Sequence, residues 1–318
     1  MQSNHDLVKE PIFLVGSERS GTTLARLMLD HHPLLAFFCE FEYSILRVSD
    51  EGEWPDLEDY IKYLEADRIF QAARVTIDKT LAFPHLVNSF LVQKRDRDAK
   101  PFVGATVHYH FDRLLRIWPD ARFIHLLRDG RDVARSSIEM GWAGNMYTAV
   151  DQWIHAESLW EEMCKKLPES RRIEVRYESL VSEPVETLTR ICNWMGIPYD
   201  PEMLSYCERS TYGPPSPKAI GQWKRKLTPS EAALAEVRIG NMRQERGYEL
   251  SGYPVPELTS KPLRRLKPQD RFYRANFRRK KYGTLLYMTD VLSRRAKHQP
   301  SARWTQRKID KIDTLNLK

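Results

Sequence analysis

Short apolar runs alternate with stretches of helical hydrophobic spacing over the first 200 residues of the chain. The apolar runs predict strands at 12–15, 102–103, 122–127 and 172–177. Apolar positions three and four residues apart predict helices at 22–30, 111–118, 132–140, 150–167, 185–195 and 230–246. Strands that alternate with helices favour a three-layer α/β/α fold, in which helices cover both faces of a central parallel sheet.

The alternating pattern ends between residues 213 and 254. A Gly-Pro-Pro-Ser-Pro loop begins at Gly213, and from Pro254 onward proline, lysine and arginine dominate. We therefore predict a main domain over residues 1–253 and a basic, partly helical C-terminal extension over 254–318. A chain of 318 residues with 42% hydrophobic residues, including 8 Trp, 14 Tyr and 12 Phe, can bury a sizeable core.

The net charge of +7 is unevenly distributed along the chain. Residues 261–318 contain 18 basic and 4 acidic residues, whereas the first 260 residues contain 32 basic and 39 acidic ones. The tail therefore carries +14 and the rest of the chain −7. Because the basic excess lies in the tail, the pI of about 9.1 is not the signature of a nucleic-acid-binding domain, and no nucleic-acid partner is expected.

Three features bear on the compartment of the protein. No run of 18 apolar residues occurs, which excludes an ordinary membrane-spanning helix. The first 11 residues are polar and lack the apolar segment of a signal peptide. The 4 cysteines have neither metal-ligand nor disulfide spacing and are expected to be free thiols. These features predict a cytoplasmic protein without a metal site.

A glycine-rich loop follows the first predicted strand, with the sequence Gly-Ser-Glu-Arg-Ser-Gly-Thr-Thr-Leu over residues 16–24. Free backbone N–H groups at such a helix N-terminus bind phosphate. The glycine spacing matches a Walker A loop, but Thr22 stands where a nucleoside triphosphatase needs lysine, which argues against ATP or GTP hydrolysis. Arg19, with the backbone and hydroxyl groups of residues 20–23, can instead hold an anion.

A second motif begins where the strand at 122–127 ends. Arg128 leaves the strand at the edge where α/β sheets place ligand sites, and Ser136 follows on the next helix. A guanidinium and a hydroxyl so placed can hold a second phosphate. Alternatively, the charged residues at 128–132 form solvated ion pairs at the helix start, and this motif alone does not decide between the two interpretations.

Together, the two motifs resemble those of sulfotransferases that use 3′-phosphoadenosine 5′-phosphosulfate (PAPS). The resemblance covers roughly residues 11–250 and is closer to the tyrosylprotein sulfotransferase branch and its bacterial relatives than to the cytosolic phenol and steroid branch. It implies a fold like that of P-loop nucleoside triphosphatases. It also implies transfer of a sulfuryl group from PAPS to a hydroxyl or amine by in-line displacement, with a carboxylate base and no metal.

The resemblance further implies roles for individual residues. The residues expected to bind PAPS or its product are Arg19, Ser20, Gly21, Thr22, Thr23, Arg128, Ser136, Tyr177 and Lys218. The residues expected to act in catalysis are Glu40 as the base, Arg19 as the loop cation and Ser210 as a transition-state contact.

The choice of the base stays open between two residue types. Glu40 and Glu42 compete for the role, and the distance from the loop cation favours Glu40. Both could also be solvated loop acids. His108 and His110 are rival bases, because the ordinary pKa of histidine suits that role.

The chain departs from the resemblance at residues 103–107, where relatives often carry a lysine and this chain has Val-Gly-Ala-Thr-Val. The missing lysine supports an alternative, a non-catalytic nucleotide-binding scaffold of the same fold. A P-loop kinase is a weaker alternative.

The acceptor and further partners are not identified by the motifs. Lipid, carbohydrate, peptide and small natural-product acceptors all stay open, and the aromatic residues expected near an acceptor pocket are Phe37, Phe38, Trp54, Phe83, Phe90, Trp142 and Tyr147. In the tail, Arg278–Lys281 lies among aromatic residues and precedes an apolar stripe. Such a segment can contact an anionic membrane peripherally, pack on its own domain or form a homodimer.

Overall fold

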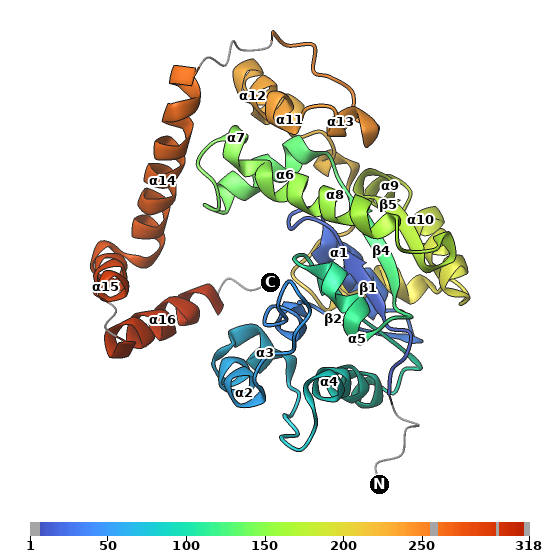
Figure 1. Ribbon diagram of the computed structural model, residues 1–318. Helices are drawn as coiled ribbons and strands as arrows, with labels where there is room; N and C mark the ends of the chain where they lie inside the picture. Colours follow the sequence, from blue (N-terminus) through green and yellow to red (C-terminus); the bar gives the residue numbers. More distant parts are fainter. Residues whose placement is uncertain (1–6, 255–259, 297–298, 315–318) are drawn as a thin grey trace. The chain divides into compact units, whose positions relative to one another are not determined.

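The computed structural model describes residues 7–254, 260–296 and 299–314 (Figure 1). The chain forms two compact units, the first made of Met1–Arg128 and Gln152–Ile220 and the second of Asp129–Asp151 and Gly221–Lys318. Each unit is therefore built from segments that are far apart in the sequence.

This division does not follow the predicted boundary near residue 253. The second unit joins the segment after Arg128 to the whole stretch from Gly221 onward, including the basic tail. The assignment of 254–318 as an extension of the main domain stays a prediction, and its residues 255–259, 297–298 and 315–318 lie outside the described residues.

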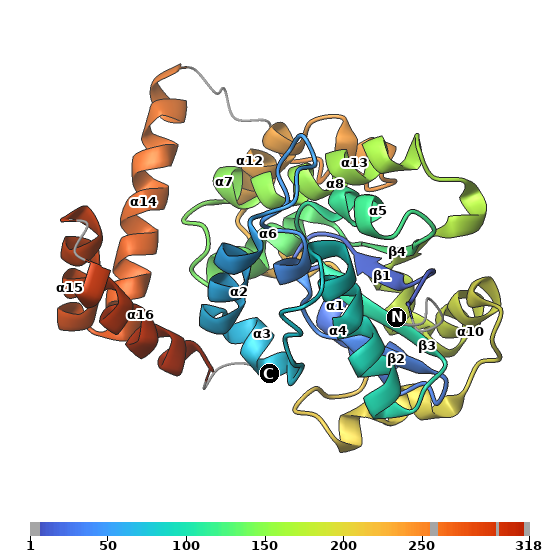
Figure 2. The same cartoon turned by 60° about the horizontal axis from the view of Figure 1, so that its bottom comes forward.

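A parallel sheet of five strands runs through the first unit in the order β2-β3-β1-β4-β5 (Figure 2). The strands are β1 Ile12–Val15, β2 Leu35–Phe38, β3 Phe102–Val107, β4 Arg122–Leu127 and β5 Arg172–Arg176. The chain adds β2 and β3 on one side of β1 and then β4 and β5 on the other. The strand order thus reverses at β1, and the carboxyl end of β1 is the point where such sheets bind ligands.

Helices of the first unit cover both faces of this sheet, which confirms the predicted three-layer α/β/α fold. They are α1 Thr22–Asp30, α2 Leu57–Ala66, α3 Arg68–Ala73, α4 Phe83–Asp98, α5 Leu114–Ile117, α8 Asp151–Cys164, α9 Tyr177–Ser182 and α10 Pro184–Met195. Single 3₁₀ turns lie at Glu42–Ser44, Phe111–Arg113, Glu169–Arg171 and Pro217–Ala219, and a longer 3₁₀ segment at Pro201–Glu208.

Alternate side chains of β1 point into two separate cores. Phe13 and Val15 belong to a cluster that includes side chains of α4, α5 and α8. Ile12 and Leu14 belong to a second cluster with side chains of α1, α9 and α10. Since both faces of the strand are buried, its four residues read as one continuous apolar run.

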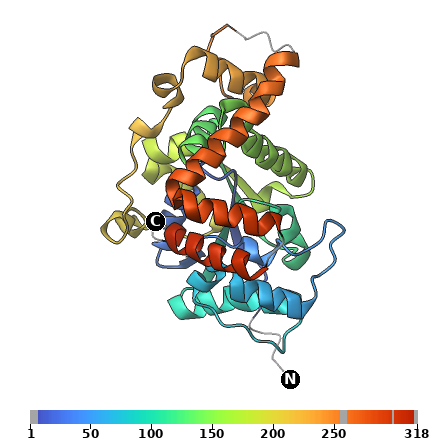
Figure 3. The same ribbon diagram turned by 90° about the vertical axis from the view of Figure 1, so that its left-hand side faces the viewer.

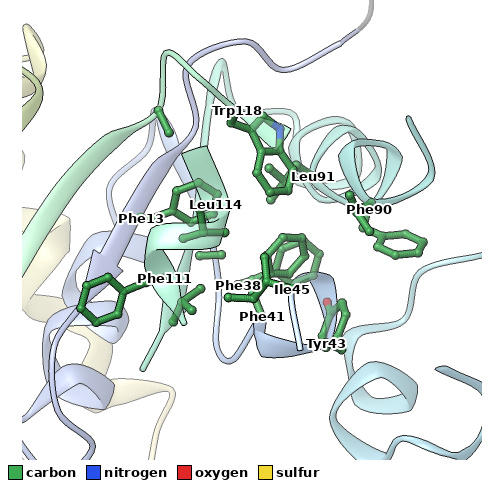
Figure 4. Close-up of a cluster of buried hydrophobic side chains, with 14 of the residues drawn as sticks. Phe13, Phe38, Phe41, Tyr43, Ile45, Phe90, Leu91, Phe111, Leu114 and Trp118 are labelled. Carbon is green, nitrogen blue, oxygen red and sulfur yellow. The ribbon is translucent and has the colours of Figure 1, made fainter. Parts of the chain in front are cut away.

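The first of these cores is rich in aromatic rings (Figure 4). The Phe13 and Trp118 ring centroids lie 5.3 Å apart, and Phe38 stacks on Phe41 at 5.4 Å. Phe37, Phe38, Phe83 and Phe90, expected near an acceptor pocket, are all buried in the cores, whereas Trp54 and Trp142 are exposed.

Helices and loops make up the described part of the second unit (Figure 3). The helices are α6 Gly130–Glu139, α7 Met146–Ala149, α11 Trp223–Lys226, α12 Pro229–Ile239, α13 Met242–Glu245, α14 Ser260–Tyr282, α15 Thr284–Arg295 and α16 Gln299–Thr314. The Asp270 carboxylate of α14 accepts hydrogen bonds from the backbone N–H of Gly144, at 2.7 Å, and from the Thr148 hydroxyl, at 2.9 Å. The basic tail is therefore tied to α7 and its preceding loop.

Two predicted helices differ in the structure. The helix predicted at 111–118 is a 3₁₀ turn followed by the short α5. The helix predicted at 230–246 begins at a capping box formed by Thr228 and Glu231, and it ends before Gly240, whose φ of 64° leaves the helical region. The chain then continues as α13.

Among residues 7–254, 260–296 and 299–314, no helix has the length and apolar character needed to cross a membrane.

A histidine at the centre of β4 is held by two carboxylates. His125 is fully buried, with Nε2 3.2 Å from Glu157, Nδ1 3.4 Å from Glu174 and its ring stacked on Trp160 at 4.6 Å. Burial alone would lower the pKa of the His125 imidazole, but the Glu157 carboxylate, assisted by Glu174, outweighs it and raises this pKa to about 8. The folded protein therefore keeps His125 protonated at neutral pH.

We expect His125 to make the stability of the protein depend on pH above neutrality. Its pKa of about 8 in the folded protein exceeds the ordinary 6.5. The contribution of His125 to the free energy of unfolding is therefore complete below pH 6.5 and is lost as the pH rises through 8. A shift of this size corresponds to about 2 kcal/mol. The free energy of unfolding, measured with urea between these pH values, should fall by this amount in the wild type and not in His125→Gln.

His85→Gln, which changes an exposed histidine, is the matched control and should keep the wild-type dependence. An NMR titration in which the His125 ring titrates at its ordinary pKa would contradict the expectation.

Candidate functional site

The loop between β1 and α1 is fixed by two glycines. A β-carbon at Gly16 would lie 2.5 Å from the carbonyl oxygen of Leu126 in β4, so only glycine lets the two strands approach this closely. A β-carbon at Gly21 would lie 2.3 Å from the Tyr177 ring, and Gly21 itself has a φ of 95°. Between them Arg19 adopts a left-handed conformation with a φ of 70°. The sequence motif thus encodes one specific loop shape.

The N-terminus of α1 is open to an anion. Gly21 is its N-cap residue, no side chain caps it, and its first turn contains no acidic residue. The Ser20 hydroxyl is buried and has no hydrogen-bond partner among the described residues. A buried hydroxyl without a partner is costly in a folded protein. A helix N-terminus with this hydroxyl beside it fits a bound phosphate or sulfate group.

Arg128 joins three segments of the first unit. Its guanidinium donates to the carbonyl oxygens of Arg19 and Ala219, each at 3.1 Å, and lies 4.2 Å from the centroid of the Tyr177 ring. The backbone carbonyl of Arg128 in turn accepts a hydrogen bond from the Trp153 indole at 2.9 Å. Both ends of this residue are held, so its charge has a defined position at the carboxyl edge of the sheet.

A cavity of about 270 Å³ opens at this edge, within the first unit. Among the predicted site residues, Arg19, Gly21, Thr22, Thr23, Arg128 and Tyr177 line it. The remaining lining residues are Leu24, Val181, Tyr212, Gly213, Pro214, Pro215, Ser216 and Ala219. The sequence motifs predicted the side of the cavity that contains Arg19 and Arg128. They did not predict the side formed by the loop at 212–216, because no binding motif marks that loop.

The exit of β3 contacts the start of the loop. His108 is buried, and its Nδ1 lies 3.0 Å from the carbonyl oxygen of Gly16. Because a carbonyl only accepts, Nδ1 carries the proton and Nε2 is the basic nitrogen of the neutral ring. The backbone N–H of His108 donates to the Glu42 carboxylate at 2.7 Å.

The carboxyl group of Glu42 is strongly affected by its surroundings. Burial raises its pKa from 4.5 to about 7, the charge of Glu40 adds to the rise, and His108 opposes it. Glu42 begins a 3₁₀ turn two residues after Glu40, and the charges of the two carboxyl groups interact.

A second group of polar side chains holds Glu18, the residue before the loop cation. Tyr109 and Gln152 both donate hydrogen bonds to the Glu18 carboxylate, and Gln152 also donates to the Tyr109 hydroxyl at 2.7 Å. His108 and Tyr109, which are adjacent in sequence, therefore fix the two ends of the segment 16–18. This role of the β3 exit could not be recognised from residue types alone.

The charged residues after Arg128 are not solvated pairs. Asp129, Arg131 and Asp132 are buried within the second unit. The Arg131 guanidinium donates to Asp129 at 2.7 Å and to Glu236 at 2.5 Å, and it stacks over the Trp223 ring at 3.7 Å. The alternative of solvated helix-start pairs is therefore wrong for these three residues, which instead tie α6 to α11 and α12.

Five predicted residues lie outside the cavity lining: the buried Ser20, described above, and Ser136, Ser210, Lys218 and Glu40. Ser136 is buried on α6, in the second unit. The Ser210 hydroxyl accepts a hydrogen bond from the backbone N–H of Tyr212 at 3.2 Å, within its own loop. Lys218 is exposed on a 3₁₀ turn, next to the Ala219 that contacts Arg128, and Glu40 is half-buried after β2. Their roles stay predictions.

Within the described part of the chain, no group of three or more His, Cys, Asp and Glu side chains is arranged to hold a metal ion.

Comparison with known proteins identifies the family. The model of the sulfotransferase family matches residues 11–201. Protein-tyrosine sulfotransferase A of Caenorhabditis elegans is 28% identical over 208 residues, which cover 61% of this chain and 52% of that protein. Protein-tyrosine sulfotransferase of Drosophila melanogaster is 25% identical over 203 residues, which cover 62% of this chain and 40% of that protein. The chain thus spans about half or less of the length of these curated relatives.

A solved structure shares the fold. The sulfotransferase domain of the Synechococcus PCC 7002 olefin synthase superposes with a TM-score of 0.60 at 19% identity, covering 79% of this chain and 98% of that domain. The family model spans both the glycine-rich loop and the Arg128 motif, which carried the resemblance seen in the sequence. The chain belongs to the sulfotransferase family.

Proposed function

We propose that this protein is a sulfotransferase that binds PAPS at the N-terminus of α1 and transfers its sulfuryl group to a hydroxyl or amine acceptor. One observation carries the proposal: in a member of this family, the buried Ser20 hydroxyl and the uncapped N-terminus of α1 adjoin a cavity that Arg19 and Arg128 line. These groups fit the anionic ends of one nucleotide.

The loop side of the cavity would hold the 5′-phosphosulfate. Backbone N–H groups at the start of α1 and the Ser20, Thr22 and Thr23 hydroxyls supply donors, and Arg19 supplies positive charge. The glycines keep side chains away from the backbone, so an anion can approach these N–H groups closely.

The strand side of the cavity would hold the rest of the nucleotide. Arg128 is proposed to bind the 3′-phosphate together with Ser136, with Tyr177 and Lys218 contacting the nucleotide. The Tyr177 ring is already positioned by its contacts with Gly21 and with the Arg128 guanidinium. The attraction between the guanidinium and the ring helps to fix the orientation of Tyr177 at the cavity wall.

The reaction needs few groups. A lone pair of the acceptor oxygen or nitrogen forms a bond to sulfur, and the bond from sulfur to the bridging phosphate oxygen breaks. The electron pair of that bond leaves with adenosine 3′,5′-bisphosphate, and the acceptor proton passes to the base. Donors and cations at the loop stabilise the charge that grows on the departing phosphate. Arg19, which lines the cavity, is proposed for this role, and Ser210 is proposed to assist.

Glu40 is proposed as the base, on the strength of its distance from Arg19 in the motif. A specific observation favours a second candidate, because Nδ1 of His108 is bonded to Gly16 and its Nε2 is thereby left as the basic nitrogen. Glu42, with a pKa of about 7, exchanges protons near neutrality and lies against the backbone of His108.

The remaining assignments do not depend on the described site. The acceptor is proposed to be a lipid, a carbohydrate, a peptide or a small natural product. Residence in the cytoplasm and assembly as a homodimer stay predictions.

We expect adenosine 3′,5′-bisphosphate to raise the melting temperature of the protein more than ATP with Mg²⁺ does, because the cavity lacks the Walker lysine. With PAPS and a panel that represents the four acceptor classes, release of adenosine 3′,5′-bisphosphate should depend on an acceptor. If the nucleotide binds but no adenosine 3′,5′-bisphosphate is released from PAPS, the non-catalytic scaffold is favoured. If only ATP with Mg²⁺ raises the melting temperature, the P-loop kinase is favoured.

Replacing Ser20 should separate binding from stability. In Ser20→Ala a buried hydroxyl without a partner is removed, so the melting temperature of the ligand-free protein should stay the same or rise. The affinity for adenosine 3′,5′-bisphosphate should fall on the order of tenfold, since a hydrogen bond to a charged group is lost.

Calorimetric titration measures this affinity, and Ser89→Ala, which removes a hydroxyl bonded to Leu86 in α4, is the control. Unchanged affinity in Ser20→Ala would remove Ser20 from the site.

Replacing the base should abolish transfer and spare nucleotide binding. Glu40→Gln keeps the size of the side chain but cannot take a proton, so acceptor-dependent release should fall at least about a hundredfold. Glu42→Gln and His108→Gln are tested alongside. Near-normal turnover in Glu40→Gln, with loss in His108→Gln, would move the role of the base to the histidine.

A further inference from the structure

The helix α15 carries an exposed apolar stripe on the surface of the second unit. Leu285, Met288 and Leu292 are spaced three and four residues apart, so they share one side of the helix, and Leu285 is 83% exposed. Arg295, three residues further along, continues the same side and is also exposed. Large apolar side chains gathered on one exposed helix side mark an interaction surface.

The opposite side of α15 faces the rest of the tail. The Asp290 carboxylate accepts a hydrogen bond from the Thr305 hydroxyl of α16 at 2.8 Å, and Ser293 and Thr305 are buried. Figure 3 shows α15 and α16 packed side by side. With 3.6 residues per turn, Asp290 lies about half a turn away from the stripe. Therefore α16 does not cover the stripe.

Positive charge borders the stripe at both ends of α15. The last turn of α14 contains exposed basic side chains directly before the helix, and Arg294 and Arg295 end the helix itself. The exposed basic side chains at the end of α14 are Arg278, Arg279, Lys280 and Lys281. Lys281 pairs with Asp313 at 2.8 Å and Arg294 with Asp290 at 2.9 Å.

Each of the four acidic residues of the tail accepts hydrogen bonds from neighbouring groups. Asp270 bonds to Gly144 and Thr148, Asp290 to Thr305 and Arg294, Asp310 to Gln306, and Asp313 to Tyr282 and Lys281. Asp270, Asp290 and Asp313 are thus held in contacts within the second unit, whereas Asp310 bonds to the neutral Gln306 on its own helix, so the surface beside the stripe is apolar and predominantly positive.

We propose that the stripe of Leu285, Met288 and Leu292 inserts into the surface of an anionic lipid bilayer. Apolar side chains on one side of a helix enter the boundary between headgroups and acyl chains, and the flanking basic residues contact anionic headgroups. Arg295 can extend its aliphatic stem along the stripe and keep its charge among the headgroups. Each basic residue near an anionic membrane adds attraction that weakens with salt.

A second copy of the chain fits this surface less well. A two-fold contact between two α15 stripes would bring positive ends against positive ends, which repel each other. Three apolar side chains on a 12-residue helix are also far fewer than the 20–30 residues that each partner contributes to a stable interface. An anionic bilayer attracts the basic residues that flank the stripe and can accommodate its small apolar area.

The full chain is tested by co-sedimentation with two kinds of vesicle, one of phosphatidylcholine alone and one of equal parts phosphatidylcholine and phosphatidylglycerol. We expect binding to the anionic vesicles, weak or no binding to the neutral ones, and a decline in binding with added salt. Equal partitioning to both kinds of vesicle, or none to either at low salt, would overturn the proposal.

Two sets of substitutions assign the binding to the stripe. Leu285→Gln, Met288→Gln and Leu292→Gln together remove the apolar contact, and Arg278→Ser, Arg279→Ser, Lys280→Ser and Arg295→Ser together remove the charge. Each set should weaken partitioning at least about tenfold. Val185→Gln, at an exposed apolar residue of α10, and the pair Lys165→Gln and Lys166→Gln, just after the end of α8, are the matched controls and should bind as the wild type does.

Circular dichroism and the melting temperature show whether each variant folds as the wild type does. The altered side chains of α15 are exposed, so the fold should survive. Wild-type vesicle binding by the apolar variant would refute the proposal. A wild-type dimer in light scattering that this variant converts to monomers would instead assign the stripe to a second copy.

Discussion

The candidate site depends on one buried cation, the guanidinium of Arg128. It bonds to carbonyl oxygens on the glycine-rich loop and on the turn at Ala219, and it stacks on Tyr177. Taking a guanidinium out of water is costly unless acceptors surround it. The carbonyl oxygens therefore do two things at once: they compensate the charge, and they fix the loop and the turn relative to the end of β4. The shape of the cavity therefore depends on the hydrogen bonds between the Arg128 guanidinium and these two carbonyl oxygens.

Contacts on the other side of the glycine-rich loop also fix its shape. Gly16 allows β1 and β4 to approach so closely that a side chain there would collide with the Leu126 carbonyl, and Gly21 leaves room for the Tyr177 ring. His108 and Tyr109 then hold the segment between β1 and Arg19. The backbone donors at the start of α1 are held in place before any ligand binds. Groups preorganised in this way stabilise developing charge without having to reorient during the reaction.

The sequence predicted those parts of the fold whose signal is local. The bounds of β1, α1 and β4 agree with the predicted ranges, since an apolar run or a helical period defines each of them. The strand β2 was missed, because Leu-Ala-Phe-Phe gave only a short aromatic run that suggested a pocket. The helix α4 was missed for another reason: it buries Asn88 and Lys94 along with its apolar residues, which blurs its periodicity.

The site was predicted where a motif carries the chemistry and missed where only tertiary contacts define it. Arg19, Thr23 and Arg128 were found from their spacing, and they line the cavity. Two buried partners of Arg131, Trp223 and Glu236, could not be found, because they follow it by about a hundred residues and no local pattern links them. In general, residue types indicate which charges are present, while the fold decides whether they face water or one another.

Burial acts on two ionisable groups of the first unit with different results, and the partner decides the outcome. For His125, the Glu157 carboxylate outweighs burial and the imidazole stays charged, with a pKa of about 8. For Glu42, burial is only partly opposed by His108, and the carboxyl becomes half protonated near pH 7. Since the pKa of Glu42 is raised, its protonated form contributes stability that is lost as the pH rises from 4.5 through 7. A proton is therefore exchanged near neutrality beside the loop that Gly16 begins, and the charge state of Glu42 there is coupled both to Glu40 and to His108.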